Sequence, residues 1–209
     1  MGTTHDLTRT RQRRIVLLPS LLVFAITTAM SSTAQQISLQ IDPAKTTVRF
    51  TLDAALHTVH GTFQAKQGTF QFDPTSGQIS GQVLVDAKSG QTGNGMRDRK
   101  MNKDVIESEQ YPEITFRPVR IEGTVVQQGK SSVTVHGMFT IHGEEHDIGI
   151  PARVEINADE WTATAHFSVP YAKWGLKNPS TLFLRVSESV EVELAAGGSV
   201  VKNPVRPGQ

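Results

Sequence analysis

Two histidines four residues apart, His142 and His146 in the sequence HGEEH, are the first residues whose types and spacing suggest chemistry. In metalloproteases, histidines at this spacing bind zinc from one face of a helix, and a glutamate directly follows the first of them. Here Gly143 takes the place of that glutamate, and the flanking residues alternate between apolar and polar, which is typical of strands. The motif therefore predicts a solvent-exposed hairpin turn; a metal shared by the two histidines with Glu144 or Glu145 is the alternative.

The other chemistry-bearing residues are sparse. His57 and His60 lie three apart, so on a regular strand they face opposite sides and cannot chelate together. His136 and His166 alternate against apolar neighbours, which predicts surface imidazoles. The sequence contains no G-x-S-x-G elbow and no P-loop, and GNGMRD lacks the third glycine of a dinucleotide-binding fingerprint. We therefore expect no catalytic residues, no metal site and no enzymatic activity.

One charged stretch, residues 93–116 (GNGMRDRKMNKDVIESEQYPEITF), breaks the two-residue alternation. Met101 and Val105 are four apart, which predicts a short helix that lays one apolar ridge on its neighbours. Asn94 is a suitable cap at its start. Pro112 is expected to end it, because the residue before a proline is pushed out of the helical region. The stretch is therefore predicted to be a helical crossover that covers one end of the strands.

The charges of this predicted helix run against its dipole, because basic residues stand near its positive end and acidic residues near its negative end. Lys103 and Glu107 form one modest i,i+4 pair. Two explanations are open for the basic end: Arg97 pairs locally with Asp98 or a nearby loop acid, or Arg97 and backbone N–H groups form an anion site. The residues concerned are Arg97, Arg99, Lys100, Glu107 and Glu109.

From residue 48 onward, apolar and polar residues alternate in segment after segment, joined mostly by short turns. This pattern predicts about eight or nine antiparallel strands with one buried face. Such a chain either stacks two sheets or closes into a barrel. Glycines on the inward faces, at 61, 81 and 137, favour the barrel. The candidate interior side chains, which pack a core or line a ligand channel, are Val48, Phe50, Leu52, Phe63, Phe116, Phe139, Ile141 and Phe167.

A second candidate site is the loop 169–180, VPYAKWGLKNPS, which carries Trp174. An aromatic side chain with a polar handle suits the mouth of a pocket. The alternative is a loop that is simply anchored by one buried tryptophan.

The two ends of the chain differ from its middle. A basic segment followed by an apolar one and then by small residues predicts a signal peptide at residues 1–34, and hence a periplasmic or secreted protein. Residues 35–196 form the predicted domain, and 197–209 lack periodicity and are predicted to be a flexible tail. Beyond residue 34 the net charge is −2, which gives no reason to expect nucleic acid as a partner. The absence of cysteine excludes disulfides and thiolate metal sites.

Several motifs in order, TTVRFTL, TVHGTF, GNGMRDRKM, YPEITF and VHGMFTIHGEEHDIGIP, resemble the pattern of the YceI-like family from about residue 37 to 194. The resemblance implies a single lipocalin-like antiparallel barrel of about eight strands with one short helical crossover. It also implies an exported protein that binds an isoprenoid lipid, such as an isoprenoid quinone or a prenyl diphosphate, without catalysis.

On this resemblance, the interior residues above and Trp174 contact the lipid, and Arg97 and Arg99 bind its head group. Two positions depart from the family pattern: Arg99-Lys100 where many members have a histidine, and Asp53-Ala54 where many have a His-Met or similar pair. A metal-binding or enzymatic stress protein that uses the hairpin histidines, and a filled barrel acting as an interaction module, remain as alternatives. A homodimer and a transient membrane contact also stay open.

Overall fold

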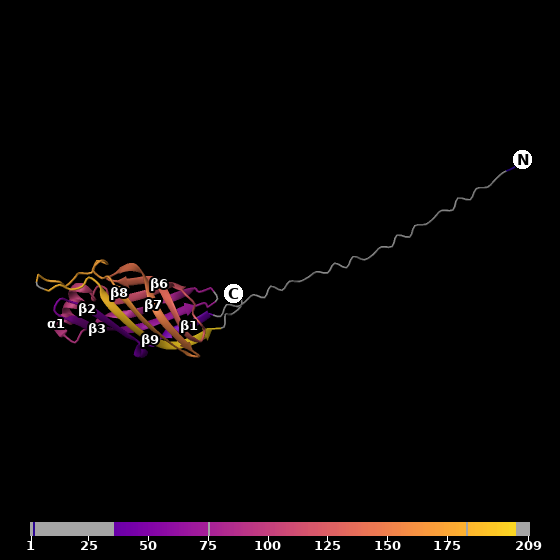
Figure 1. The fold of residues 1–209 in the computed structure, drawn as a ribbon, viewed down its shortest axis with the longest axis horizontal. Helices are drawn as coiled ribbons and strands as arrows, with labels where there is room; N and C mark the ends of the chain where they lie inside the picture. The colour runs from indigo at the N-terminus through magenta and orange to yellow at the C-terminus, as the bar shows by residue number, and fades with distance from the viewer. Residues whose placement is uncertain (1, 3–35, 75, 183, 204–209) are drawn as a thin grey trace. The chain divides into compact units, whose positions relative to one another are not determined.

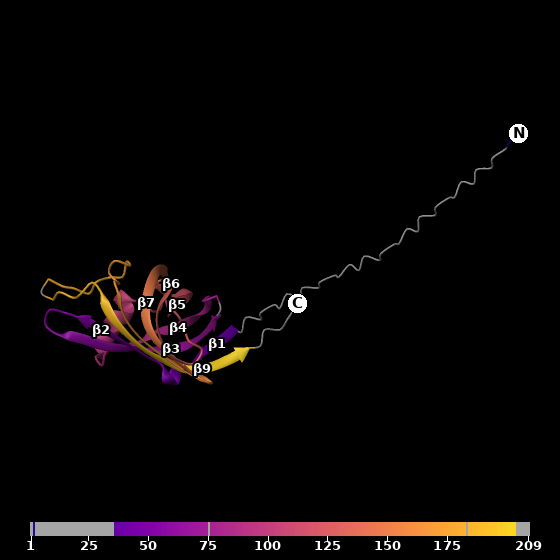
Figure 2. The same ribbon diagram turned by 45° about the vertical axis from the view of Figure 1, so that its right-hand side comes forward.

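The computed structural model describes residues 2, 36–74, 76–182 and 184–203 (Figures 1 and 2). Apart from Gly2, the predicted signal peptide lies outside the described residues. The strands are β1 (Gln36–Ile41), β2 (Thr47–Asp53), β3 (Thr58–Phe72), β4 (Ile79–Gln91), β5 (Glu113–Glu122), β6 (Gly129–Ile141), β7 (Glu144–Asn157), β8 (Glu160–Val169) and β9 (Val190–Asn203). Short helical segments are η1 (Pro43–Lys45), α1 (Gly95–Lys100) and η2 (Met101–Val105).

These strands form one closed antiparallel barrel, as the sequence predicted. Each strand pairs with the next in the order β1-β3-β2-β9-β8-β7-β6-β5-β4, and an additional pairing of β3 with β4 closes the sheet. β1 and β2 share one position: both pair with β3 on one side and with β9 on the other, one after the other along the barrel. Nine described strands therefore build a barrel of eight positions.

The break between β1 and β2 has a local cause. Asp42 caps η1 by accepting a hydrogen bond from the backbone N–H of Ala44, and Pro43 begins the helical turn. Proline fits the first turn of a helix but has no N–H to donate to a strand ladder. The strand is therefore interrupted there and resumes in the same position at Thr47.

Inward glycines allow close contacts in the barrel wall, as predicted. A Cβ on Gly137 would collide with the backbone carbonyl of Arg117 and lie 2.8 Å from the Phe116 ring. A Cβ on Gly61 would collide with the ring of Phe50 and lie 2.7 Å from a backbone oxygen. Glycine at these positions leaves room for the aromatic rings inside the barrel.

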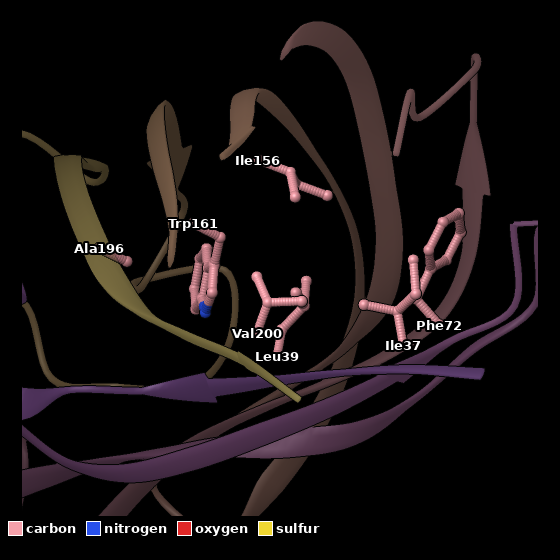
Figure 3. Close-up of a cluster of buried hydrophobic side chains, with 7 residues drawn as sticks. All are labelled: Ile37, Leu39, Phe72, Ile156, Trp161, Ala196 and Val200. Atoms are coloured by element: carbon pink, nitrogen blue, oxygen red, sulfur yellow. The ribbon is translucent and has the colours of Figure 1, made fainter. Parts of the chain in front are cut away.

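The end of the barrel opposite α1 is filled by a compact apolar cluster (Figure 3). Trp161 in this cluster donates its indole N–H to the carbonyl of Gln40 at 3.0 Å. Ile156 beside it is 1% exposed. The cluster comprises Ile37, Leu39, Phe72, Ile156, Trp161, Ala196 and Val200. This end is therefore closed by packed side chains.

The predicted boundary between domain and tail at residues 196 and 197 is wrong. Residues 197–203 continue β9, where 198–203 pair with β1 and 197–199 pair with β8. Glycine at 198 is required because a Cβ there would collide with the carbonyl oxygen of Gln40. Residues 204–209 lie outside the described part of the chain. Within the described part, no helix has the length and apolar character needed to cross a bilayer.

Candidate functional site: a cavity in the barrel

The half of the barrel that adjoins α1 encloses a cavity of about 500 Å³. Its walls are apolar side chains from the strands, and the aromatic rings of Phe50 and Phe63 contact each other within it at 5.4 Å between centroids. The volume falls within the ordinary range of small-molecule sites. Six of the interior residues named from the sequence line this cavity: Val48, Phe50, Leu52, Phe63, Phe139 and Ile141.

A second cavity, of about 180 Å³, lies toward the closed end. The other two predicted interior residues, Phe116 and Phe167, line this cavity, and so does Val48. Three valines from three strands, Val48, Val85 and Val192, line both cavities and therefore stand between them. The interior thus holds two neighbouring apolar cavities that meet at these three valines, called here the valine constriction, and it is not completely filled by side chains.

Among the described lining residues, the charged, histidine and amide side chains of the larger cavity lie at one end. Together with Thr92, they line the rim that is formed by α1, the residues before it and the turn between β2 and β3: His57, Asn94, Arg97 and Lys100. The rest of the rim comes from the segment between β8 and β9, which contributes Pro179, Leu184 and Val186. The cavity is therefore amphiphilic along its length, with apolar walls inside and basic and hydrogen-bonding groups at the mouth.

The crossover helix covers the cavity much as predicted. Asn94 accepts hydrogen bonds from the backbone N–H groups of Met96 and Arg97, both at 3.1 Å, and so caps α1. Met101 and Val105 line the cavity and pack on the apolar cluster beneath them. The expected apolar ridge is confirmed.

The predicted end of the helix is wrong. The helical hydrogen bonding changes to a π-type turn in η2, where the N–H of Ile106 donates to the carbonyl of Met101. Glu107 then takes a left-handed conformation with φ of 52°, which stops the helix five residues before Pro112. The Glu107 carboxylate lies 3.1 Å from the imidazole of His142. Glu107 therefore pairs across to the β6–β7 hairpin, and the predicted pair with Lys103 is not formed.

Arg97 belongs to a local network at the mouth. Its guanidinium donates to the hydroxyl of Thr92 at 2.8 Å and to the carbonyl of Thr92 at 3.1 Å. The carboxylate of Asp98 accepts from both the N–H and the hydroxyl of Thr92. Arg97 and Asp98 are thus linked through Thr92. This arrangement resembles the first explanation above, in which Arg97 pairs locally with Asp98.

The anion-site explanation needs correction in one part. The N–H groups of Met96 and Arg97 are already bonded to the Asn94 side chain, so these backbone donors are not free for an anion. Arg97 itself still lines the cavity. Arg99 is exposed and does not line the cavity, whereas its neighbour Lys100 does.

The segment between β8 and β9 is anchored at several points. Tyr171 is 5% exposed and donates its hydroxyl to the carbonyl of Ser187 at 2.6 Å. Burial, with a smaller contribution from Glu188, raises the pKa of Tyr171 from 10.0 to about 12. Trp174 packs on Phe139 and lines neither cavity, which corresponds to the alternative of an anchored loop.

The hairpin histidines are not brought together on a shared site. His142 and Gly143 form the turn, both with positive φ, and His142 packs against Tyr111. His146 points the other way and stacks on Trp174. Among the described residues, no three histidine, cysteine or acidic side chains are grouped so that they hold a metal ion. His136 pairs with Glu122 and His166 with Glu191 on the outer surface, as predicted for surface imidazoles.

The family model described as YceI-like domain matches residues 39–197. The chain belongs to this family. Among curated proteins, this YceI-like domain is similar to a UPF0312 protein of Vibrio cholerae serotype O1 (strain M66-2), with 27% identity over 143 residues, 67% of this chain and 74% of that protein. It is also similar to a UPF0312 protein of Pseudomonas syringae pv. tomato, with 32% identity over 97 residues, 45% of this chain and 48% of that protein.

Solved structures share the fold of this YceI-like domain. BcnA of Burkholderia cenocepacia superposes with a TM-score of 0.62 at 21% identity, covering 76% of this chain and 99% of BcnA. A polyisoprenoid binding domain from Saccharophagus degradans superposes with a TM-score of 0.59 at 15% identity, covering 78% of this chain and 98% of that domain. At these identities, the likeness shows the fold.

The two positions that depart from the family pattern both lie at the mouth of this YceI-like domain. Ala54 lines the cavity and pairs with Val186 as an isolated bridge. The carboxylate of Asp53 beside it accepts a hydrogen bond from the hydroxyl of Thr58, and the backbone carbonyl of Asp53 accepts one from the N–H of Ser187. Asp53 is thereby used to hold the rim together.

Proposed function

We propose that this YceI-like domain binds one amphiphilic isoprenoid lipid in the barrel interior and carries or sequesters it without chemical change. An isoprenoid quinone or a prenyl diphosphate has the required form, a branched apolar chain with one polar head. We further propose that the protein acts in the periplasm or outside the cell, in keeping with the signal peptide predicted from its sequence.

The observation that carries the proposal is the polarity of the larger cavity. Its strand-borne walls are apolar, and its polar groups are confined to the mouth around Arg97, Thr92 and Lys100. Removing apolar surface from water is worth about 25 cal/mol per Å², or roughly 0.8 kcal/mol per methylene, so the prenyl chain would supply most of the affinity. A soluble polar metabolite would lose its hydration against these walls without compensating hydrogen bonds.

The packed end of the barrel is consistent with a prenyl chain that enters from the mouth. Among the described residues, the apolar cluster that includes Trp161 packs the end of the barrel opposite α1, so we expect the lipid to enter at the mouth. Behind the valine constriction, the smaller cavity has room for the far end of a chain. The related polyisoprenoid binding domain from Saccharophagus degradans adds support from within the same fold.

Titration of delipidated protein with prenols of graded chain length tests this proposal. We expect one prenol per barrel, with affinity rising with chain length until the interior is filled. Phe139→Trp places a larger ring in the cavity wall and should reduce prenol occupancy, whereas Val119→Ser on the outer surface should leave it unchanged. If wild-type protein takes up no prenol of any length, or if folded Phe139→Trp binds as well as wild type, the proposed site is wrong.

A further inference from the structure

The three most exposed large apolar side chains among the described residues all lie at the cavity mouth. Leu182 is 90% exposed, Leu56 is 79% exposed and Met96 is 75% exposed. Each comes from a different rim segment: the turn between β2 and β3, helix α1, and the segment between β8 and β9. In Figure 1, α1 and this last segment, in orange, lie at the same end of the barrel.

Hydrogen bonds fix the backbone of the two segments that carry the leucines. The N–H of Thr181 donates to the carbonyl of Leu184 at 2.8 Å, and the N–H of Leu184 donates back to the Thr181 hydroxyl at 3.2 Å, so Leu182 lies within a tight turn. The N–H of Ala55, next to Leu56, donates to the carbonyl of Arg185 at 2.9 Å. The two leucines are therefore borne by segments that are hydrogen-bonded to each other.

These three segments, taken with their flanking residues, carry an excess of positive charge. Residues 53–57, 92–105 and 170–189 together contain seven Lys and Arg and four Asp and Glu, a net charge of +3. The remaining residues from 35 onward carry a net charge of −5. The rim is thus a basic region on an otherwise acidic domain.

Most basic residues of the rim are outside the ion pairs, whereas several acidic residues at the same end of the barrel are paired. Glu107, Glu109 and Glu145, at the same end of the barrel, pair with His142, Lys88 and Arg117. In the part of the chain that the structure describes, the ion pairs include none of these exposed rim residues: Arg99, Lys100, Lys103, Lys173, Lys177 and Arg185.

We propose that the mouth of the barrel docks on an anionic membrane surface. Leu56, Met96 and Leu182 enter the interfacial region of the bilayer, and the surrounding lysines and arginines contact anionic lipid head groups. Membrane-binding surfaces combine apolar side chains that insert with basic residues that attract anionic lipids. The mouth presents both, as exposed apolar side chains and basic residues outside the ion pairs. This inference rests on the proposed function, because docking in this orientation brings the cavity entrance to the source of the lipid.

Flotation with vesicles that contain no isoprenoid tests the docking separately from lipid uptake. The vesicles are made of phosphatidylcholine alone, or of equal parts of phosphatidylethanolamine and phosphatidylglycerol. The wild-type protein is expected to float with the anionic vesicles and to be released as salt is raised, because salt screens the attraction. Leu56→Ser/Leu182→Ser should lower the partition coefficient on them by about tenfold or more.

Charge variants complete the test. Lys103→Glu/Lys173→Glu/Lys177→Glu should lower partition onto anionic vesicles by at least about tenfold and leave the weak partition onto phosphatidylcholine unchanged. The matched control is Val119→Ser/Val126→Ser, which removes exposed apolar side chains away from the mouth and should float like wild type.

Two outcomes overturn the docking proposal: wild-type protein that floats with neither vesicle, or flotation that survives in both mouth variants. Either outcome would leave a protein partner as the occupant of the rim. Prenol titration of the leucine and charge variants in solution is the second readout. If they bind prenol like wild type but do not float, docking is confirmed independently of the cavity. If the wild-type protein floats with the anionic vesicles but neither it nor any variant binds prenol, the proposed function is wrong and the docking proposal stands.

Discussion

The indole ring of Trp174 stacks on the imidazole ring of His146, with centroids 4.2 Å apart and planes 1° from parallel. His146 lies directly opposite Phe139 in the β6–β7 ladder, and Trp174 also contacts the Phe139 ring at 5.7 Å. One tryptophan thus joins the long segment between β8 and β9 to the barrel wall. The segment that forms part of the cavity mouth is held in place by this contact.

Trp174→Ala should therefore loosen this segment. We expect a loss of about 2 kcal/mol in the free energy of unfolding, below the range for a fully buried tryptophan because Trp174 is only half-buried. Urea denaturation measures the loss. Trp174→Phe keeps an aromatic ring and should recover most of the stability; equal stability of wild type and Trp174→Ala would contradict the anchoring role.

Gly137→Ala should destabilise the barrel. The added methyl group meets the Arg117 carbonyl and the Phe116 ring, so a strand must shift. Overpacking of this kind costs about 1–3 kcal/mol. Gly95→Ala, at the start of α1, is the matched control: its methyl group meets only the end of the Arg99 side chain, at 3.6 Å, and should be neutral or stabilising by up to about 1 kcal/mol. Thermal unfolding measures both variants. If the two substitutions shift the unfolding temperature in the same direction, this account is wrong.

Tyr171 should make stability fall at high pH. Because the pKa of Tyr171 is raised to about 12 in the folded state, the neutral phenol favours folding. Its contribution is complete below about pH 10, the ordinary tyrosine value, and is lost as the pH rises through about 12. Tyr171→Phe lacks this titration and should lose about 1 kcal/mol at neutral pH with the hydrogen bond to Ser187.

Urea denaturation of both proteins at several pH values from neutral to 12 checks the tyrosine prediction. Above pH 10, the curve of unfolding free energy against pH should be shallower for Tyr171→Phe than for wild type. Parallel curves over this range would show that the Tyr171 hydroxyl does not titrate differently in the folded protein.

Arg97→Ala should weaken binding of a prenyl diphosphate more than binding of the uncharged prenol of the same length. Arg97 lines the cavity mouth, and a guanidinium makes strong charge-assisted bonds to phosphate oxygens. We expect a loss of roughly tenfold in diphosphate affinity, measured by calorimetric titration. Arg99→Ala is the comparison, because Arg99 is exposed outside the cavity lining and should change affinity less. An unchanged preference of Arg97→Ala for the two head groups would remove Arg97 from the site.

The barrel wall was the part of the fold that sequence pattern predicted well. Alternation depends on one buried face per strand, so Phe50, Phe63 and Phe139 could be placed inside before their partners were known. β1 lies before the first predicted strand, although Ile37, Leu39 and Ile41 alternate with polar residues. The end of β9 was missed because its Gly197-Gly198 pair resembles a loop signal, whereas here it allows close approach to Gln40.

The mouth could be predicted only in outline. Asn94 and the apolar ridge of Met101 and Val105 were accessible because helix caps and i,i+4 spacing are local. The early end of the helix was not, since Glu107 leaves the helix toward His142, which lies far away in the sequence. The cavity, its valine constriction and the stacking of Trp174 on His146 depend on which strands lie side by side. Spacing along the chain does not contain that information.

Organic extraction of the protein purified from an exporting, lipid-replete host, followed by mass spectrometry of the extract, tests the central claim most directly. The account predicts one isoprenoid lipid per barrel, with much less in folded Phe139→Trp. An extract of the wild-type protein without any isoprenoid lipid would contradict it.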